Sequence, residues 1–528
     1  MNKKKIFAVV LSCFVFVGGI YYFITESIEN QKKKEIKQKE QSFNNDENVD
    51  ISNEFYTLYH NVSNMTFISK YGIQISLEDF KGKNVIITYW DSEFDDSKEQ
   101  ILKAEEFKKI SEEYDNTEYI LVHRSDDNNN QVMKNALKYI EDNNIDVNLF
   151  FDSNMSLHSK LRLKSVPATF AINKEGKLAS LKEGLILDTN SMKAFINNVI
   201  ESPSYATEKF VRENMINNDG GINITIKNDE NNSDEIILSE SQGIMIEYAN
   251  ITGEEELFNS TLNYINNYMK NDRLISWKVE NGEASRVNAV IDDLRVYDAL
   301  YHGVEKFGVK EKDLKEYRES IYKYNVENNN LVDCYDFSNN QKSQRLTLCF
   351  GDFNALGELW AENWRFKKVY NNTLEIVKNG YINDNFPLYY SWYNYADGQY
   401  EKDDLNISEA LVTILHLSEI GEEKPETIWW LKDQVKNGTL YGRYTVDGKV
   451  TEGYEYESTA AYALAALIGK EVNDTELIND AISKMERMRI NDLSSEYYGA
   501  FGNLDGSGIY SFDQCMALLA YGELEKSY

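Results

Sequence analysis

A series of acidic residues, each at the start of an apolar helical segment, most limits how the C-terminal part of this chain can fold. The series is Glu240, Asp292, Asp293, Asp352, Glu409, Glu457 and Asp513. Its members recur about every 50 to 60 residues, the length of a helical hairpin with its loops. Second helical segments, such as residues 255–269 and 475–485, lie between them. The spacing predicts six hairpins, and thus an all-α (α/α)6 barrel over residues 203–528 whose inner helices all begin at one mouth.

These acidic residues have two explanations. Asp and Glu in a first helical turn interact favourably with the helix dipole and need no other function. The alternative is a ligand site, because most of these acids stand close to aromatic residues and glycines. Carboxylates and rings around one mouth suit glycan cleavage, in which rings stack on sugars and two carboxyl groups share the proton transfers.

The composition favours a neutral ligand. A net charge of -31 repels phosphates, which argues against nucleic acid or an anionic membrane surface as the partner. The five His show no metal-ligand spacing such as His-Glu-x-x-His, and no Gly-rich phosphate loop is evident, so the sequence implies no cofactor and no metal. Cys334 and Cys349 flank two short predicted strands, and they are expected to be either a cross-strand disulfide or two buried free thiols.

The N-terminus predicts a membrane anchor. A basic flank precedes a run of apolar residues long enough for a transmembrane helix, and no small-x-small cleavage site follows it. We therefore expect residues 1–25 to be an uncleaved signal anchor that spans the cell membrane once through residues 6–23, with the body outside the cell. A cleaved signal peptide is the rival interpretation. Residues 26–52 are polar and predict a tether.

Residues 53–200 have the strand and helix order of an α/β domain. Residues 84–90 and 118–126 read as strands, and residues 165–180 read as a strand pair with a turn at Glu175-Gly176. This order resembles the thioredoxin fold of membrane-anchored thiol-disulfide oxidoreductases, and Pro167 matches the cis-proline of that family. Phe94 and Ser97 stand where the family has its Cys-x-x-Cys pair.

The missing cysteines decide what this domain can do. Thiol exchange needs an attacking thiolate, and neither Phe94 nor Ser97 can supply one. The redox function is therefore expected to be lost. The remaining interpretation is a spacer, or a docking module for a partner such as the exopolysaccharide synthesis machinery.

The segment Ser239-Glu240-x-Gln242-Gly243 resembles the acid-bearing motif of glycoside hydrolase family 8, and the resemblance covers most of residues 203–528. It implies that Glu240 is the general acid and that Gln242 contributes to substrate binding. Residues 288–300 resemble the family's second motif, with Asp293 at its second Asp. Ile291 takes the place of the first Asp, which leaves Asp292 as the nearest substitute.

The resemblance implies an endo-acting extracellular hydrolase that inverts configuration on a β-linked (exo)polysaccharide. A protonated Glu240 would donate to the glycosidic oxygen, and a base about 6.5 to 9.5 Å away would activate water on the opposite face. Asp352 is the candidate base, and Asp292 and Asp293 are expected to contact the cleaved sugar or hold the water. Candidate sugar-stacking residues are Trp277, Tyr335, Trp392, Tyr441 and Tyr444. The alternative is a catalytically inactive glycan-binding or exopolysaccharide-assembly protein, which the departure at Ile291 favours.

Overall fold

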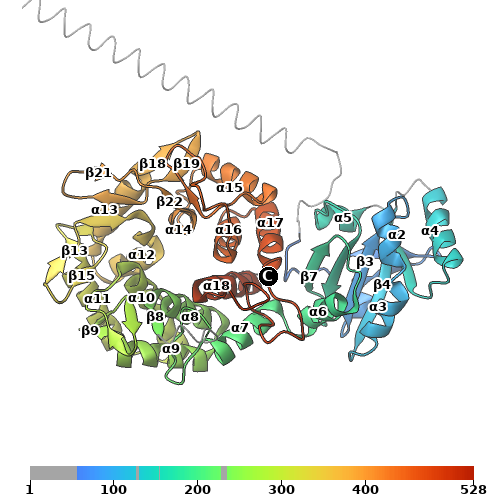
Figure 1. Ribbon diagram of the computed structural model, residues 1–528, viewed down its shortest axis with the longest axis horizontal. Helices are drawn as coiled ribbons and strands as arrows, with labels where there is room; N and C mark the ends of the chain where they lie inside the picture. Colours follow the sequence, from blue (N-terminus) through green and yellow to red (C-terminus); the bar gives the residue numbers. More distant parts are fainter. Residues whose placement is uncertain (1–55, 126–129, 154, 227–234, 528) are drawn as a thin grey trace, which may run out of the picture. The chain divides into compact units, whose positions relative to one another are not determined.

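The computed structural model describes residues 56–125, 130–153, 155–226 and 235–527 of the chain (Figure 1). The predicted anchor, residues 1–25, and the predicted tether, residues 26–52, lie outside these ranges. Across the described residues, none of the helices combines the length and the apolar character needed to cross a bilayer.

The N-terminal α/β domain is built on a seven-stranded sheet, counted over its described residues, with the order β2-β1-β5-β4-β3-β6-β7. The strands are β1 (Thr66–Ser69), β2 (Gln74–Ser76), β3 (Asn84–Trp90), β4 (Thr117–Arg124), β5 (Asn148–Asp152), β6 (Ala168–Ile172) and β7 (Leu178–Glu183). Strands β3, β4 and β5 are parallel, and β6 and β7 continue the sheet antiparallel to β3. The three strand regions predicted from the sequence are confirmed.

The helices of this domain are α2 (Asp95–Ile101), α3 (Ala104–Ser111), α4 (Asn130–Asp142), α5 (Ser156–Lys160) and α6 (Thr189–Ile200), with a 3-10 turn η1 (Leu77–Phe80). All seven residues of β3 are buried, as expected of a central strand covered on both faces. Ile86 and Trp90 pack in one apolar cluster with Phe107 of α3, whereas Ile87 and Tyr89 belong to the other cluster. The peptide bond before Pro167 is cis, as the resemblance implied.

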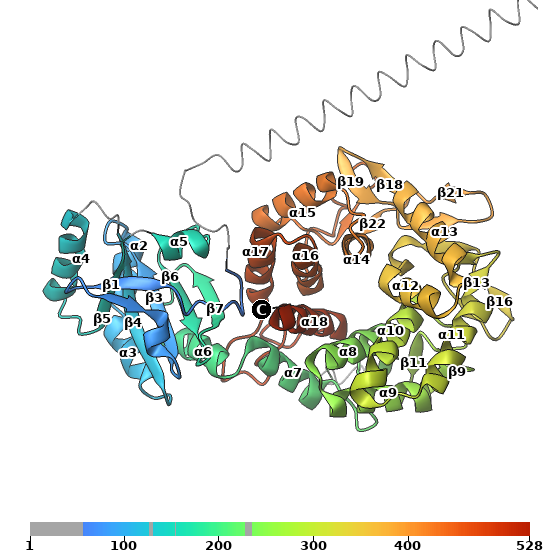
Figure 2. The ribbon, with the colours of Figure 1, turned by 180° about the vertical axis from the view of Figure 1, so that it is seen from behind.

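The C-terminal domain is a ring of paired helices (Figures 1 and 2). In its described residues the inner helices are α8 (Ser239–Thr252), α10 (Val290–Phe307), α12 (Phe353–Glu362), α14 (Ile407–Ser418), α16 (Thr459–Glu471) and α18 (Ser511–Ser527). The outer helices are α7 (Pro203–Asn214), α9 (Glu255–Tyr268), α11 (Glu311–Asn325), α13 (Phe366–Asn379), α15 (Pro425–Asn437) and α17 (Thr475–Glu486). Each inner helix packs on the next, and α18 packs on α8, which closes the ring.

Local sequence signals explain many of the helix ends. Pro203 and Pro425 occupy the first turns of α7 and α15, where the missing N–H costs nothing. Gly253 and Gly308 follow α8 and α10 with φ values of 80° and 68°, a left-handed conformation that glycine adopts without strain. Each inner helix begins within two residues of an acidic residue of the series, so the predicted helix starts are confirmed.

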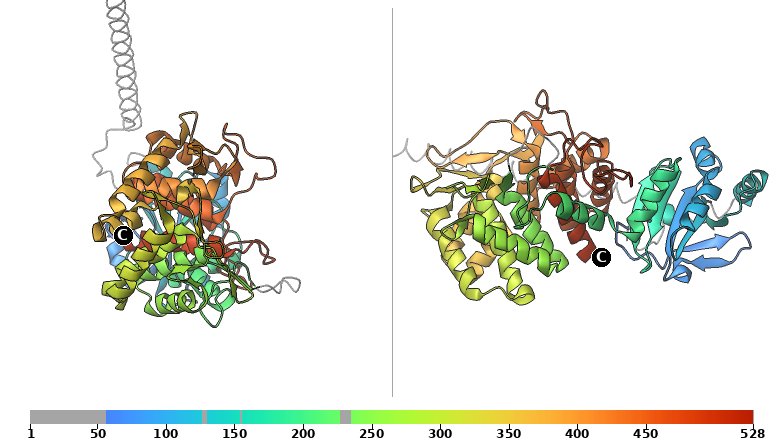
Figure 3. Two further views of the ribbon diagram at one scale, coloured as in Figure 1. Left: turned by 90° about the vertical axis from the view of Figure 1, so that its left-hand side faces the viewer. Right: turned by 60° about the horizontal axis from the view of Figure 1, so that its bottom comes forward.

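The connections between the helices contain short strands, many of them paired in hairpins (Figure 3). They contain β8 (Ile236–Leu238), β9 (Lys270–Asn271), β10 (Leu274–Ile275), β11 (Lys278–Glu280), β12 (Glu283–Ala284), β13 (Val326–Glu327), β14 (Asn330–Leu331), β15 (Tyr335–Asp336), β16 (Gln341–Lys342), β17 (Arg345–Thr347), β18 (Tyr381–Asn383), β19 (Phe386–Tyr389), β20 (Trp392–Asn394), β21 (Gln399–Tyr400), β22 (Leu405–Asn406) and β23 (Arg443–Tyr444), with a 3-10 turn η2 (Leu348–Phe350). Cys334 and Cys349 are both free thiols, so the expected alternative to a disulfide holds, except that Cys349 is buried and Cys334 is only partly buried.

Candidate active site

The first turn of α8 is anchored on three sides by the residues around Glu240. The Ser239 backbone N–H donates to the carbonyl oxygen of Trp277 at 3.0 Å, and its Oγ donates to Asp292 Oδ2 at 2.5 Å. The Oγ atoms of Ser241 and Ser511 lie 2.7 Å apart, which joins α8 to α18. These bonds fix the start of α8 against both neighbouring inner helices and so fix the position of Glu240.

Glu240 lies on the inner side of the ring, because its electrostatic partners belong to other inner helices. They are Asp292 and Arg295 on α10 and Glu409 on α14. Burial raises the pKa of Glu240 to about 7; repulsion by Asp292 and Glu409 adds to this, and Arg295 opposes it. A carboxyl group with this pKa is substantially protonated near neutral pH, as a general acid must be.

Asp292 is held between two partners and is 4% exposed. Its Oδ2 accepts from Ser239, and its Oδ1 lies 3.2 Å from Nη1 of Arg295. Burial raises the pKa of Asp292, while Arg295 and Ser239 oppose the shift. Asp292 therefore sits next to Glu240 with a fixed orientation and adds negative charge to its surroundings.

Asp293 points away from this group and is fully buried. Its Oδ1 accepts from the Ile275 N–H at 3.0 Å and from the Tyr317 hydroxyl at 2.6 Å, and its Oδ2 accepts from Asn288 Nδ2 at 2.6 Å. These three donors come from different segments, so Asp293 ties α10 to α11 and to the loop that precedes α10.

Asp352 lies with a different group of acids. It is the N-cap of α12, where its Oδ1 accepts from the Ala355 N–H at 2.9 Å. Burial, together with the negative charge of Asp298, raises the pKa of Asp352 to about 6. Asp298 stands near the middle of α10, further along the helix than Asp292. The structure therefore brings Glu240 and Asp292 together and places Asp352 deeper in the ring.

The other predicted site residues divide into exposed and buried groups. Trp277 is 41% exposed beside the start of α8, and Trp392 lies on β20 with the Arg345 guanidinium 4.9 Å from its ring centroid. Tyr335 belongs to hairpin β15–β16 and packs against Tyr324 at a centroid distance of 4.8 Å.

Three predicted site residues form hydrogen bonds within the protein, namely Gln242, Tyr441 and Tyr444. Gln242 is fully buried, and its Nε2 donates to the Gly220 carbonyl at 3.2 Å. The hydroxyl of the buried Tyr444 donates to the Thr439 carbonyl at 2.6 Å and accepts from the Tyr441 N–H at 2.9 Å. Tyr444 thus holds the turn that carries the partly exposed Tyr441.

Glu409 belongs to the acidic series, but sequence reasoning assigned it no role. It is exposed in the first turn of α14, the third inner helix from α8 in either direction around the ring. Partial removal from water raises the pKa of Glu409, which Arg443 and Arg345 oppose. The one sequence signal for Glu409 was its place at the head of an apolar helix. The sequence signal for Arg295 was weaker. It stands three residues after Asp292, a spacing that allows an ion pair on one face of a helix.

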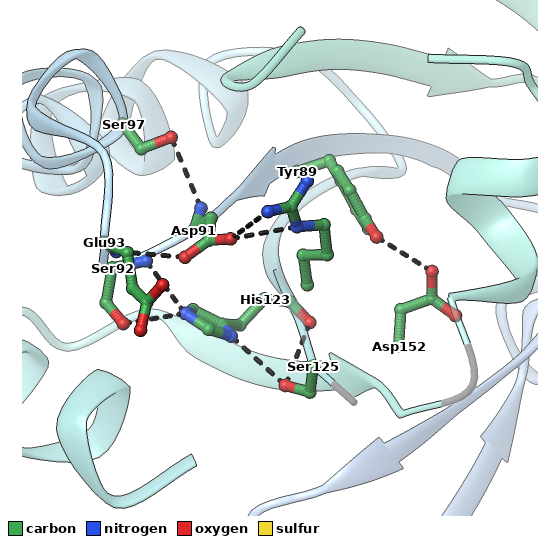
Figure 4. A network of polar contacts seen from close by, with 9 residues as sticks. Tyr89, Asp91, Ser92, Glu93, Ser97, His123, Ser125 and Asp152 are labelled. Carbon is green, nitrogen blue, oxygen red and sulfur yellow. Dashed lines mark hydrogen bonds and ion pairs between the residues drawn. The ribbon is translucent and has the colours of Figure 1, made fainter. Parts of the chain in front are cut away.

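In the α/β domain, the loop after β3 forms a polar network where the resemblance places a thiol site (Figure 4). Arg124 pairs with Asp91 at 2.7 Å, and His123 Nε2 accepts from the Ser92 N–H at 2.9 Å. Burial lowers the pKa of His123 to about 4, so its ring is neutral. Phe94 is 46% exposed and Ser97 is fully buried.

Comparisons with known proteins agree with this two-part organisation. The model of the AhpC/TSA family matches residues 60–181. The Bacillus subtilis (strain 168) protein named "Putative lipoprotein YdaJ" is 29% identical over 335 residues, which cover 61% of this chain and 88% of that protein.

Two solved structures resemble the helical part. One is described as a novel alpha-amylase from Clostridium perfringens, with 28% identity over 61% of this chain and 98% of that chain and a TM-score of 0.57. The other is PssZ from Listeria monocytogenes, with 21% identity over 60% of this chain and 94% of that chain and a TM-score of 0.49. The resemblance stated from the sequence, a thioredoxin-like domain joined to a glycosidase-like helical domain, is confirmed by the family match and the Clostridium structure.

Proposed function

We propose that the helical domain hydrolyses glycosidic bonds in a polysaccharide, with Glu240 as the general acid. The observation that carries the proposal is the carboxyl group of Glu240, held at the head of α8 beside Asp292, with a pKa of about 7 to which the charges of Asp292 and Glu409 contribute. The similarity to the Clostridium perfringens alpha-amylase over nearly the whole of that chain supports a glycosidase.

Glu409 is the carboxylate that best suits the role of base. It begins the inner helix opposite α8, so a sugar bound between them would present opposite faces to the two carboxyl groups. Arg443 and Arg345 favour its ionised form. In an inverting reaction Glu240 gives its proton to the leaving oxygen while Glu409 takes a proton from the attacking water. Solvent then returns Glu240 to its protonated form and Glu409 to its ionised form.

Asp292 and Arg295 support this chemistry from the next helix. The negative charge of Asp292 raises the pKa of Glu240 and so favours its protonated form. The positive charge of Arg295 lowers the same pKa and so limits the rise. Ser239 fixes the orientation of Asp292 by donating to it from the turn that carries Glu240. Trp277 and Trp392 are the exposed or partly exposed rings proposed to stack on sugars.

The linkage and the mode of attack are open to direct measurement. The family 8 resemblance favours endo-cleavage of a β-linked exopolysaccharide with inversion, whereas the name of the Clostridium relative favours an α-glucan. The full chain would be incubated with β-glucans, chitosan, poly-N-acetylglucosamine and starch, and new reducing ends, product lengths and the first-formed anomer would be measured. Turnover of any one polymer supports the proposal.

A non-catalytic glycan-binding protein is the second candidate, and Ile291 is the observation that favours it. The same panel separates the two functions when binding is followed by affinity electrophoresis. Retarded migration in a glycan gel with no new reducing ends would replace the hydrolase by the binding protein.

We also propose that residues 6–23 anchor the chain in the cell membrane, with the body outside. The thioredoxin-like domain then acts as a spacer or as a docking module for the exopolysaccharide synthesis machinery. The loss of both cysteines at Phe94 and Ser97 supports a role without redox chemistry.

A further inference from the structure

A second group of acidic residues surrounds a cavity deeper in the helical ring. The cavity has a volume of about 740 Å³ and is lined mainly by the second halves of the inner helices and by α12. Its acidic lining residues are Glu247, Asp298, Glu358, Glu419, Glu471 and Glu523. None of them belongs to the group formed by Glu240, Asp292 and Glu409.

Among the described residues, two of these acids, Glu247 and Glu419, have no ion-pair partner, whereas the other four face Lys470 or His302. Lys470 pairs with Glu471 at 3.0 Å and also with Glu523, and Lys306 donates to the Asn250 carbonyl at 2.6 Å. Burial and the charge of Asp298 raise the pKa of Glu247 to about 8 and that of Glu358 to about 9. Carboxyl groups held this close together repel one another in their ionised forms, a repulsion that a bound cation would remove.

A buried histidine with an unused nitrogen adds the second observation. His416, in the last turn of α14, is 6% exposed, and its Nδ1 has no hydrogen-bond partner. Oε2 of Glu419, three residues later, is also buried without a partner. One ligand atom each from Asp352, His416 and Glu419 lie within 4.8 Å of one another.

The local structure explains why these three residues meet. His416 and Glu419 are separated by three positions at the end of α14, so their side chains lie on one face. Asp352 caps the start of α12, the neighbouring inner helix, at the same depth in the ring.

A second histidine near the cavity has a different environment. His302 lies 3.5 Å from Asp298 and 3.5 Å from Glu358, and about half of its side chain is exposed. A hydrogen bond that its ring donates to Asp298 raises the pKa of His302. His302 therefore has two carboxylate partners, whereas Nδ1 of His416 has no hydrogen-bond partner.

We propose that Asp352, His416 and Glu419 bind a divalent metal ion of the zinc class. One imidazole and two carboxylates are the ligand types that Zn²⁺ accepts, with water from the cavity completing the coordination. The ion joins the start of α12 to the end of α14 and neutralises part of the surplus negative charge. It stabilises the ring at a site separate from the proposed catalytic group.

The test measures metal content and does not depend on activity. The full chain, without an affinity tag, would be stripped with chelator and dialysed against ZnCl2, and bound zinc would be measured per chain. We expect one equivalent and a thermal midpoint that rises with zinc. His416→Gln and the isosteric Glu419→Gln should each weaken binding at least about tenfold, since even residues outside the ligand sphere have effects of this size.

His302→Gln is the matched control, because it removes an imidazole near the same cavity but leaves the three ligands intact. It should retain one equivalent of zinc. A wild-type chain that binds no zinc would overturn the proposal, as would unchanged binding by a folded Glu419→Gln variant. Loss of zinc from His302→Gln with retention by His416→Gln would also overturn it, because the ion would then lie at the other histidine.

Discussion

Replacing Glu240 by Gln distinguishes a catalytic acid from a residue that only caps a helix. The substitution keeps the shape of the side chain but removes its proton and its charge. If Glu240 served only the helix dipole, the variant would lose about 0.3 to 1 kcal/mol of stability and keep its activity. If Glu240 is the general acid, turnover should fall about 10² to 10⁴-fold, or about 3 to 5 kcal/mol in the barrier.

The raised pKa of Glu240 also predicts how the stability of the Glu240→Gln variant differs from that of the wild type as the pH changes. The folded-state pKa of about 7 exceeds the ordinary value of 4.5, so folding disfavours the ionised form of Glu240. The contribution of Glu240 to stability is therefore fully present below pH 4.5 and is lost as the pH rises towards 7. At 1.36 kcal/mol per pH unit the full effect is about 3 kcal/mol, and solvent at the mouth reduces it. Above pH 7 Glu240→Gln should be more stable than the wild type, and at pH 4 the difference should vanish.

The assay combines reducing-end release with urea unfolding at pH 4, 6 and 8. Glu256→Gln is the matched control, since Glu256 is an exposed first-turn acid on the outer helix α9. It should leave turnover unchanged and alter stability by less than about 0.5 kcal/mol. An active Glu240→Gln variant that is less stable than the wild type at pH 8 would refute the reasoning and leave helix capping as the explanation.

Four further outcomes are expected. Glu409→Gln should lower turnover at least about a hundredfold while glycan binding persists, and full activity would remove Glu409 from the role of base. Tyr317→Phe removes the hydroxyl that donates to buried Asp293, so the free energy of unfolding should fall by about 1 to 3 kcal/mol; Tyr324→Phe, which loses a surface bond to Asp272, should change much less in the same urea titration. The chain should not reduce insulin disulfides above background, and only Phe94→Cys with Ser97→Cys could restore such activity; reduction by the wild type would contradict the loss of redox function. If residues 6–23 are an uncleaved anchor, the protein should remain with the membranes and be released by protease added to wall-stripped cells, and a full-length cytosolic form would contradict this.

The sequence by itself indicated the main strands of the α/β domain, the inner helices of the helical domain and the motif at Glu240. Runs of β-favouring residues marked β3 and β4, and the recurring acid-headed segments marked the starts of the inner helices. These signals are local, because strand and helix periodicities and helix-start preferences act over only a few residues. The short strands between the helices carried too few residues to show a period, and apart from those between Cys334 and Cys349 they were not predicted.

The roles of individual acids depended on the tertiary structure. Asp292 and Asp293 are adjacent in the chain, yet one lies beside Glu240 and the other is enclosed by Ile275, Tyr317 and Asn288, because successive helical residues point in different directions. Asp352 looked like the other helix starts, but it caps a short helix that begins deeper in the ring.

The grouping of Asp352 with His416 and Glu419 was equally invisible in the sequence. The three residues come from two helices joined by a long connection, so no short spacing links them. Their burial, their unpartnered atoms and their shared charge arise only when the ring closes and brings α12 against α14. Local sequence thus specified which helices form, and long-range packing decided which carboxyl groups face one another.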